Sequence, residues 1–267
     1  MSLPLTIRRL PEVRAQTDAR TLRGTFAGVV SSTRIHHSAI EPLIPVGSGL
    51  MPVHESEDDK YLVSFLFGQQ RQVRNVWGRW EFQYGFGVKY EEVLMVIPGL
   101  KLPPTSDYSA IPAVTLYARI YLNSLCSSVL GRFMYGFSKH HGRFENEENS
   151  FTAFNRHDER IFQAKVSSAE GTVSGSEIER IRELFAQPVV FAGKPQDGGK
   201  SVLSIRQFDY EIHEDFIQPM ETEVTVDQKF TKKSPTLTFS NVGLDRDPSG
   251  SFRCEFPWIM TQCHRAA

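Results

Sequence analysis

Runs of strand-forming residues follow one another along most of the chain. Eight of them cover residues 61–67, 80–84, 92–97, 114–122, 160–166, 201–212, 221–226 and 236–239. Several runs alternate apolar with polar side chains, and β-branched and aromatic residues dominate them, which is typical of half-buried antiparallel strands. Clusters of Gly, Pro and Asp, for example at 103–107 and 195–199, separate the runs. The pattern predicts a β-rich protein.

Helical patterns are few. Ser176 and Glu179 form a Ser-x-x-Glu pattern typical of a capping box, apolar residues then recur at helical spacing, and Pro188 ends the pattern. A shorter helix is predicted for residues 38–44. No linker or low-complexity stretch divides the chain, so we expect one domain, 23–267, whose strands need sandwiching or closure to hide their edges.

An Arg-rich segment, 1–22, precedes this domain. Charges interrupt it at once, unlike the apolar core of a secretory signal. We interpret it as a solvated or subunit-packing arm rather than an amphipathic transit peptide. The three cysteines are odd in number and scattered, with neither a disulfide framework nor zinc spacing, so a reducing cytoplasm is expected.

Charge and hydropathy exclude two classes of protein. Lys plus Arg number 30 and Asp plus Glu 31 among 267 residues, giving a net charge of −1 that argues against a polyanion binder. The longest apolar runs, such as 93–98 and 189–192, are too short to span a bilayer. Residues 69–80 interleave Arg with Trp, which can stack bases, but a polar hairpin fits the neutral chain better. No nucleic acid or membrane partner is therefore expected.

The sequence has few familiar chemical motifs. It contains no Gly-rich phosphate loop, no dinucleotide-binding fingerprint and no nucleophile elbow. His36–His37 and His140–His141 are adjacent pairs, and neighbouring residues of a strand point to opposite faces. Neither pair can easily give one metal two ligands, so we expect neither a metal nor a cofactor.

One segment, residues 131–142, places a single lysine among aromatic and small residues. Lys139 is followed by His140 and His141, and glycines bracket the segment. Desolvation or a neighbouring cation would disfavour the ammonium form of Lys139 and leave a free amine, which attacks ketones to form a Schiff base. The alternative is a solvent-exposed lysine at a strand end beside two surface histidines. The residues alone favour that alternative.

The same region resembles the acetoacetate decarboxylase family. Residues 121–132 resemble the Tyr-Leu-Asp segment that leads to Gly-Arg-Glu in that family, without a gap. Residues 135–140 follow where the family has an aromatic residue, Pro and Lys-Lys. The first of those lysines forms the Schiff base, and it falls on Lys139. Acetoacetate decarboxylase is itself an example of a lysine activated by desolvation or a nearby cation.

Further matches lie upstream and downstream of this segment. Tyr90 and Glu92 resemble the family's Tyr-x-Glu strand, which implies that Glu92 is the acidic partner. Arg23, three residues before Phe26, resembles an early Arg that meets the substrate carboxylate. Weaker matches occur at 38–45, 176–188 and 195–198. The resemblance spans about residues 20–215, with an apparent insertion at 69–80.

The chain also departs from the family pattern. His140 replaces the second lysine, Ser138 replaces Pro, and Phe133 replaces the Glu of Gly-Arg-Glu. An acidic residue on an earlier strand of the family falls at Leu66. These changes suggest a different substrate or a different fate for the enamine.

The resemblance implies both a fold and a set of site residues. The fold would be an antiparallel, cone-like β-barrel with a few peripheral helices, in a homo-oligomer. We expect catalytic roles for Lys139, Glu92 and His140, and substrate contacts from Arg23, Tyr90, Arg132 and His141. Glu92 would transfer the proton, with His140 or His141 second, and Arg23 would hold the carboxylate bidentately.

Three functions remain open at this point. The first is decarboxylation of an acetoacetate-like β-keto acid through an iminium on Lys139. The second is an aldol condensation and dehydration of a 2-keto acid such as pyruvate through the same lysine. The third is a non-catalytic small-molecule-binding barrel.

Overall fold

The computed structural model describes residues 20–52, 59–77, 88–104, 106, 108–135, 137–193, 202–231, 235–243 and 250–266. Its thirteen strands are β1 (Arg20–His36), β2 (Met51–Pro52), β3 (Lys60–Trp77), β4 (Val88–Lys101), β5 (Val114–Leu122), β6 (Lys139–Glu147), β7 (Ser150–Asn155), β8 (Arg160–Ser168), β9 (Val189–Gly193), β10 (Val202–Tyr210), β11 (Ile217–Val226), β12 (Leu237–Val242) and β13 (Gly250–Ala266). The helices are α1 (His37–Ile40), α2 (Leu125–Tyr135), α3 (Gly175–Ala186) and α4 (Gln228–Thr231), with 3-10 turns η1 (Glu41–Leu43) and η2 (Glu214–Phe216).

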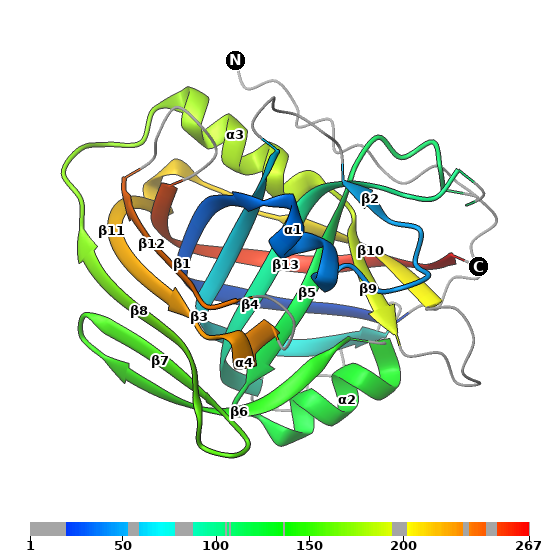
Figure 1. Cartoon of the computed structure of the whole chain (residues 1–267), viewed down its shortest axis with the longest axis horizontal. Helices are drawn as coiled ribbons and strands as arrows, with labels where there is room; N and C mark the ends of the chain where they lie inside the picture. Colours follow the sequence, from blue (N-terminus) through cyan, green and yellow to red (C-terminus); the bar gives the residue numbers. More distant parts are fainter. Residues whose placement is uncertain are drawn as a thin grey trace.

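The strands form one sheet that closes on itself (Figure 1). A ring of nine strands runs β11-β8-β7-β6-β5-β4-β3-β1-β13 and closes through the β11–β13 pairing. Strands β9 and β10 give a second, shorter connection between β5 and β13. The predicted β-rich barrel with few helices is therefore confirmed. Most pairings are antiparallel, but β5 pairs in parallel with both β6 and β9.

Strands β3 and β4 lie between two apolar clusters and are buried on both faces over much of their length. On β3, Phe65 and Phe67 belong to one apolar cluster, and the intervening Leu66 belongs to the other. On β4 the same alternation separates Met95 from Leu94. This explains the continuous apolar runs in the sequence, because a strand covered on both sides needs no polar face. The two apolar clusters therefore hold the side chains on both faces of β3 and β4 in place.

The helices lie at the periphery. In Figure 1, α2 runs beside β6 at one edge of the barrel and α3 lies at the opposite edge. On α3, Ile178, Ile181 and Phe185 are buried, as the helical pattern predicts. No helix in the described part of the chain is long and apolar enough to cross a membrane.

Four details differ from expectation. The capping box uses Ser174 and Glu177, because the sequence offers two overlapping Ser-x-x-Glu patterns and the helix starts two residues earlier. Helix α2 was not predicted as a helix, because Ser124, whose Oγ accepts a hydrogen bond from Ser127 N at 3.2 Å, caps it without the Glu of a Ser-x-x-Glu pattern. The predicted helix at 38–44 divides into α1 and η1 because Pro42 follows Glu41. Strand β5 pairs in parallel with β6 and β9, where an antiparallel barrel was expected.

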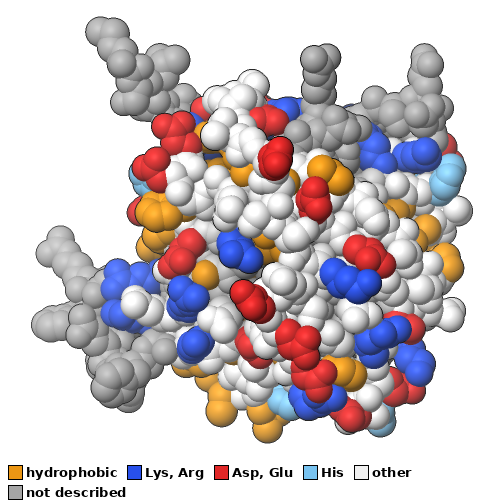
Figure 2. Space-filling view, turned by 90° about the vertical axis from the view of Figure 1, so that its left-hand side faces the viewer, with side chains coloured by type: hydrophobic (Ala, Val, Ile, Leu, Met, Phe, Trp, Pro, Cys, Tyr) orange, Lys and Arg blue, Asp and Glu red, His pale blue; other side chains and the backbone are white. Residues whose placement is uncertain are grey.

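Other predicted segments lie partly outside the described residues. Of the predicted arm, residues 1–19 fall outside them, and Arg20–Leu22 already belongs to β1. Of the Arg- and Trp-rich segment, residues 69–77 form the end of β3, which pairs with β4 and β1, and residues 78–80 are not described. On the face drawn in Figure 2, acidic and basic side chains are interspersed, as the even charge balance suggests.

Candidate active site

Lys139 lies at the start of β6, and its side chain lines a buried cavity of about 50 Å³. The main chain of β6 pairs in parallel with β5, so that Lys139 stands opposite Ile120. Most of the lining is apolar or aromatic, and it includes Phe26, Leu66, Leu94, Ile120, Phe137, Phe191, Phe208, Phe256 and Trp258. Lys139 is only 8% exposed. The structure thus places this lysine in a dry environment, not at a solvated strand end.

Helix α2 fixes the position of Lys139. A Cβ atom at Gly131 would lie 2.8 Å from Cδ and 3.2 Å from Cε of Lys139, so only glycine lets the lysine side chain pass the helix in this conformation. Arg132 Nε donates a hydrogen bond to the Lys139 carbonyl oxygen. Ser128 Oγ donates to the same oxygen at 3.5 Å. The glycine and the two donors therefore set both the side chain and the backbone of the lysine.

The surroundings of Lys139 lower the pKa of its amine. Its Nζ lies 5.1 Å from the ring centroid of Phe137 and 5.3 Å from that of Tyr90, and it donates to Tyr90 Oη at 3.4 Å. Burial lowers the pKa of Lys139, while the nearby Glu92 carboxylate acts in the opposite direction. Desolvation is the larger effect, because burial removes the water that stabilises the ammonium ion.

Glu92 is the carboxyl group of the cavity, and it is 5% exposed. Gln70 Nε2 donates to Glu92 Oε1 at 2.6 Å, and Trp258 Nε1 donates to Gln70 Oε1 at 2.8 Å. Because an indole can only donate, Trp258 fixes the orientation of the Gln70 amide and turns its NH₂ group toward Glu92. Burial raises the pKa of Glu92, and the charge of Lys139 and the Gln70 hydrogen bond each lower it. A carboxyl group with a raised pKa is suited to proton transfer near neutral pH.

Three tyrosines bring hydroxyl groups to the cavity. The hydroxyl groups of Tyr117 and Tyr210 are 2.9 Å apart, and that of Tyr90 accepts the hydrogen bond from Lys139. Burial raises the pKa of each phenol. All three therefore stay protonated. Tyr90 can donate a hydrogen bond to a bound oxygen atom, and so can the one of Tyr117 and Tyr210 that accepts the bond between them. Of the three, only Tyr90 was predicted from the sequence.

The structure brings together three of the residues expected from the sequence, namely Lys139, Tyr90 and Glu92. Leu66 also lines the cavity, at the position where the related family is expected to have an acidic residue. Gln70 and Trp258 were not foreseen, since nothing in the sequence links a glutamine to an indole 188 residues away.

The other four expected residues lie elsewhere. Arg23 is half-buried on β1 and does not line the cavity, because the spacing of three that separates it from Phe26 puts the two side chains on opposite faces of the strand. His140 points away from Lys139 for the same reason. His140, His141 and Arg132 line a separate, outer pocket. The structure does not bring these four side chains to the Lys139 amine.

The described part of the chain contains no group of three or more His, Cys, Asp and Glu side chains that could hold a metal ion. In the cavity, the reactive groups are the amine of Lys139, the carboxyl group of Glu92 and the three phenols. This combination is suited to imine formation and proton transfer.

Comparison with known proteins gives the fold class. No protein-family model and no curated protein sequence matches the chain. Among solved structures, the enduracididine biosynthesis enzyme MppR complexed with pyruvate is similar with a TM-score of 0.60 and 12% identity, covering 96% of this chain and 93% of that one. MppR complexed with the condensation product of pyruvate and imidazole 4-carboxaldehyde gives a TM-score of 0.59 and 11% identity, with 92% and 88% covered.

Acetoacetate decarboxylase from Legionella pneumophila is also similar, with a TM-score of 0.57 and 10% identity over 92% of this chain and 87% of that one. These likenesses show that the chain has the fold shared by acetoacetate decarboxylase and MppR. At such low identities they establish the fold alone, so the chemistry must be argued from the cavity.

Proposed function

We propose that this protein is an enzyme in which Lys139 forms a Schiff base with the ketone of a small β-keto acid and releases carbon dioxide. One observation carries the proposal: a single buried amine, with a lowered pKa, shares an apolar cavity with one buried carboxyl group. The likeness in fold to acetoacetate decarboxylase supports it.

The reaction begins when the neutral amine of Lys139 attacks the ketone carbon. Loss of water from the resulting carbinolamine gives an iminium ion. The bond between the α-carbon and the carboxylate then breaks, its electron pair moves into the iminium to form an enamine, and carbon dioxide leaves. Protonation of the enamine carbon and hydrolysis of the new iminium release the ketone and restore the lysine.

Two neighbouring groups assist these steps. Tyr90, whose hydroxyl group lies within 3.4 Å of the amine, donates a hydrogen bond to the oxygen that leaves as water. Glu92 in its protonated form delivers the proton to the enamine carbon, and Gln70 and Trp258 hold it in place. Gln70 and Trp258 are positioning residues, because they act through Glu92.

The lining of the cavity favours loss of the carboxylate over its retention. Lys139 is the only Lys or Arg among the described lining residues, so the iminium is the one cation near the substrate carboxylate. Both charges are costly in an apolar cavity, and loss of carbon dioxide removes both, because it leaves a neutral enamine. The small volume of the cavity, about 50 Å³, argues against a large substrate.

The second candidate is condensation of a 2-keto acid through the same imine. The similar structure of MppR holds pyruvate or a pyruvate condensation product, which favours this alternative. It requires a group that retains the carboxylate, and among the described residues only the phenols of Tyr90, Tyr117 and Tyr210 are available in the cavity for that role.

Reductive trapping with borohydride tests the imine. We expect acetoacetate plus borohydride to add the mass of the reduced adduct to Lys139, located by peptide mass spectrometry. The Lys139→Arg variant keeps the charge and cannot form the imine, so it should show no adduct. A matched control is Lys165→Arg on β8, an exposed lysine paired with Glu223, which should label like the parent protein.

The same experiment separates the candidates. Carbon dioxide released from acetoacetate supports the decarboxylase. An adduct with pyruvate, without carbon dioxide release from any β-keto acid, supports condensation. If no keto acid of a small panel labels Lys139, both proposals fail, and ligand binding that survives in Lys139→Arg without turnover would then identify a binding protein.

A further inference from the structure

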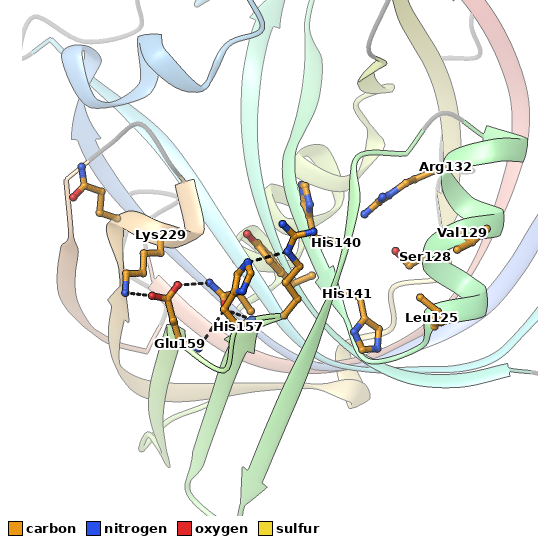
Figure 3. A pocket seen from close by; sticks show the side chains of 13 residues that line it. Leu125, Ser128, Val129, Arg132, His140, His141, His157, Glu159 and Lys229 are labelled. Carbon is orange, nitrogen blue, oxygen red and sulfur yellow. Dashed lines mark hydrogen bonds and ion pairs between the residues drawn. The ribbon is translucent and has the colours of Figure 1, made fainter. Parts of the chain in front are cut away.

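A second, larger pocket of about 700 Å³ lies on the outer side of β6. Its walls are α2, the start of β6, the turn between β7 and β8, and α4 (Figure 3). Neither Lys139 nor Glu92 lines it. We call it the outer pocket. Its volume is in the range of sites that hold small organic ligands.

Cationic side chains outnumber anionic ones in the outer pocket. Arg132, Arg156 and Lys229 face the single carboxylate of Glu159. That carboxylate is already engaged, because Lys229 Nζ lies 2.6 Å and Asn155 Nδ2 2.9 Å from its oxygen atoms. Lys229 and Glu159 neutralise one another, so the two arginines remain as an excess of positive charge.

Both arginines line the pocket, and each uses its Nε for a contact within the protein. Arg132 uses Nε to hold the Lys139 carbonyl, and Arg156 uses Nε to donate to His157 Nε2 at 3.0 Å. Within the part of the chain that the structure describes, their Nη groups have no protein partner. Two guanidinium groups with ready donors form the preferred protein surroundings for a carboxylate or phosphate group.

Three imidazoles and an apolar edge complete the outer pocket. His140, His141 and His157 all line it, and each imidazole can donate at least one hydrogen bond. On α2, Leu125 is 62% exposed and Val129 is 54% exposed, one helical turn apart on the same wall. The outer pocket therefore combines cationic groups with exposed apolar surface, and helix α2 contributes Arg132 as well as Leu125 and Val129 (Figure 3).

We propose that the outer pocket binds an organic anion, a small molecule with a carboxylate or phosphate group and an apolar part. Arg132 and Arg156 hold the oxyanion, the imidazoles donate additional hydrogen bonds, and Leu125 and Val129 cover the apolar part. This site is distinct from the Lys139 cavity and does not depend on the chemistry proposed there.

Isothermal titration with three matched probes tests this proposal. Phenyl phosphate and benzoate carry the two oxyanions on the same ring, and phenol is their neutral counterpart. We expect saturable binding of at least one anion at millimolar or lower concentration and none of phenol. Arg156→Gln should weaken binding about tenfold, the value of one charge-assisted hydrogen bond. Arg253→Gln, an equal charge change at an exposed position of β13, should leave it unchanged.

Lys139→Met locates the bound anion. Binding that persists in this variant and falls in Arg156→Gln places the anion in the outer pocket, whether or not the protein forms a Schiff base. Three results would overturn the proposal: no saturable binding of either anion, equal binding of phenol, or binding abolished by Lys139→Met and unaffected by Arg156→Gln.

Discussion

The cavity around Lys139 and the outer pocket are both lined by residues at the start of β6, but their linings differ in character. The first measures about 50 Å³ and is lined mainly by aromatic rings, with one amine and one carboxyl group. The second measures about 700 Å³ and is lined by exposed cations and imidazoles. Adjacent residues, Lys139 and His140, therefore meet different environments. The comparison teaches that neighbouring side chains of one strand can differ in burial and in the charges around them, because they point to opposite faces.

The largest effect is expected from a substitution that enlarges the cavity around Lys139. Phe191 is 1% exposed, stacks on Phe137 with ring centroids 4.2 Å apart, and lines the cavity. Phe191→Ala should lower the free energy of unfolding by about 4 kcal/mol, because a buried ring is lost and a void remains. Water in that void would raise the pKa of Lys139 toward its ordinary value. Denaturant unfolding and the pH dependence of borohydride labelling measure the two effects, and an unchanged labelling profile would contradict the role of dryness.

The second prediction concerns the two ionisable groups of the Lys139 cavity and leaves its apolar lining unchanged. Burial lowers the pKa of Lys139 and raises that of Glu92, so both groups cost stability at neutral pH. Lys139→Met combined with Glu92→Gln should raise the free energy of unfolding by about 2 kcal/mol while abolishing imine formation. Denaturant unfolding at pH 7 checks the first effect and borohydride trapping the second.

The sign of its pH dependence follows from the same shifts. Between the lowered pKa of folded Lys139 and 10.5, the unfolded chain binds more protons, so stability rises with pH in that window. Between 4.5 and the raised pKa of folded Glu92, the unfolded chain binds fewer protons, so stability falls as the pH rises. Both slopes should disappear in the double variant. Their persistence would show that other groups cause them.

The third prediction displaces the amine without changing any ionisable group. Gly131→Ala brings a methyl group to within 2.8 Å of Lys139 Cδ. We expect turnover to fall about tenfold, since misplacing a reacting group raises the barrier. Thermal stability should change little, because the displaced atoms belong to a flexible side chain and alanine favours the helix. Gly175→Ala, where a Cβ meets nothing within 4 Å, is the matched control and should keep full turnover.

The smallest effect is expected on the wall of the outer pocket. Val129 is 54% exposed, so Val129→Ser should change the free energy of unfolding by less than about 0.5 kcal/mol. It should weaken binding of phenyl phosphate more than that of inorganic phosphate, which has no apolar part. Parallel titrations of the two anions measure this difference, and an equal loss for both would argue against apolar contact at this wall.

The sequence predicted a β-rich protein through its strand patterns, and it predicted the barrel and the lysine through a resemblance. Alternation and aromatic content indicated most strands, because half-burial is a local property. Helix α2 was not predicted because Ser124 caps Leu125–Tyr135 without the Glu of a Ser-x-x-Glu pattern. The helix also includes a glycine, which the lysine requires and the helix does not. At residue 131 the packing against Lys139 requires a glycine, although a glycine is unfavourable within a helix.

The remaining parts of the site depend on register, which the sequence does not display. Phe26 on β1 stands opposite Gln70 on β3 and Phe256 on β13, and this alignment brings Trp258 to Gln70 and Gln70 to Glu92. The expectation that Arg23 lies at the site is not met, for a related reason. A residue three positions from Phe26 falls on the other face of the strand, whatever its similarity to a family motif.

The two sides of helix α2 contact different parts of the molecule, so substitutions on them have different consequences. Its inner side must keep a glycine at 131 for the lysine to pass, and the neighbouring Arg132 holds the lysine backbone. Its outer side, with Leu125 and Val129, has no such duty. During evolution, substitutions at Leu125 and Val129 can therefore alter the outer pocket without displacing Lys139. Any substitution at Gly131, in contrast, shifts the side chain of Lys139.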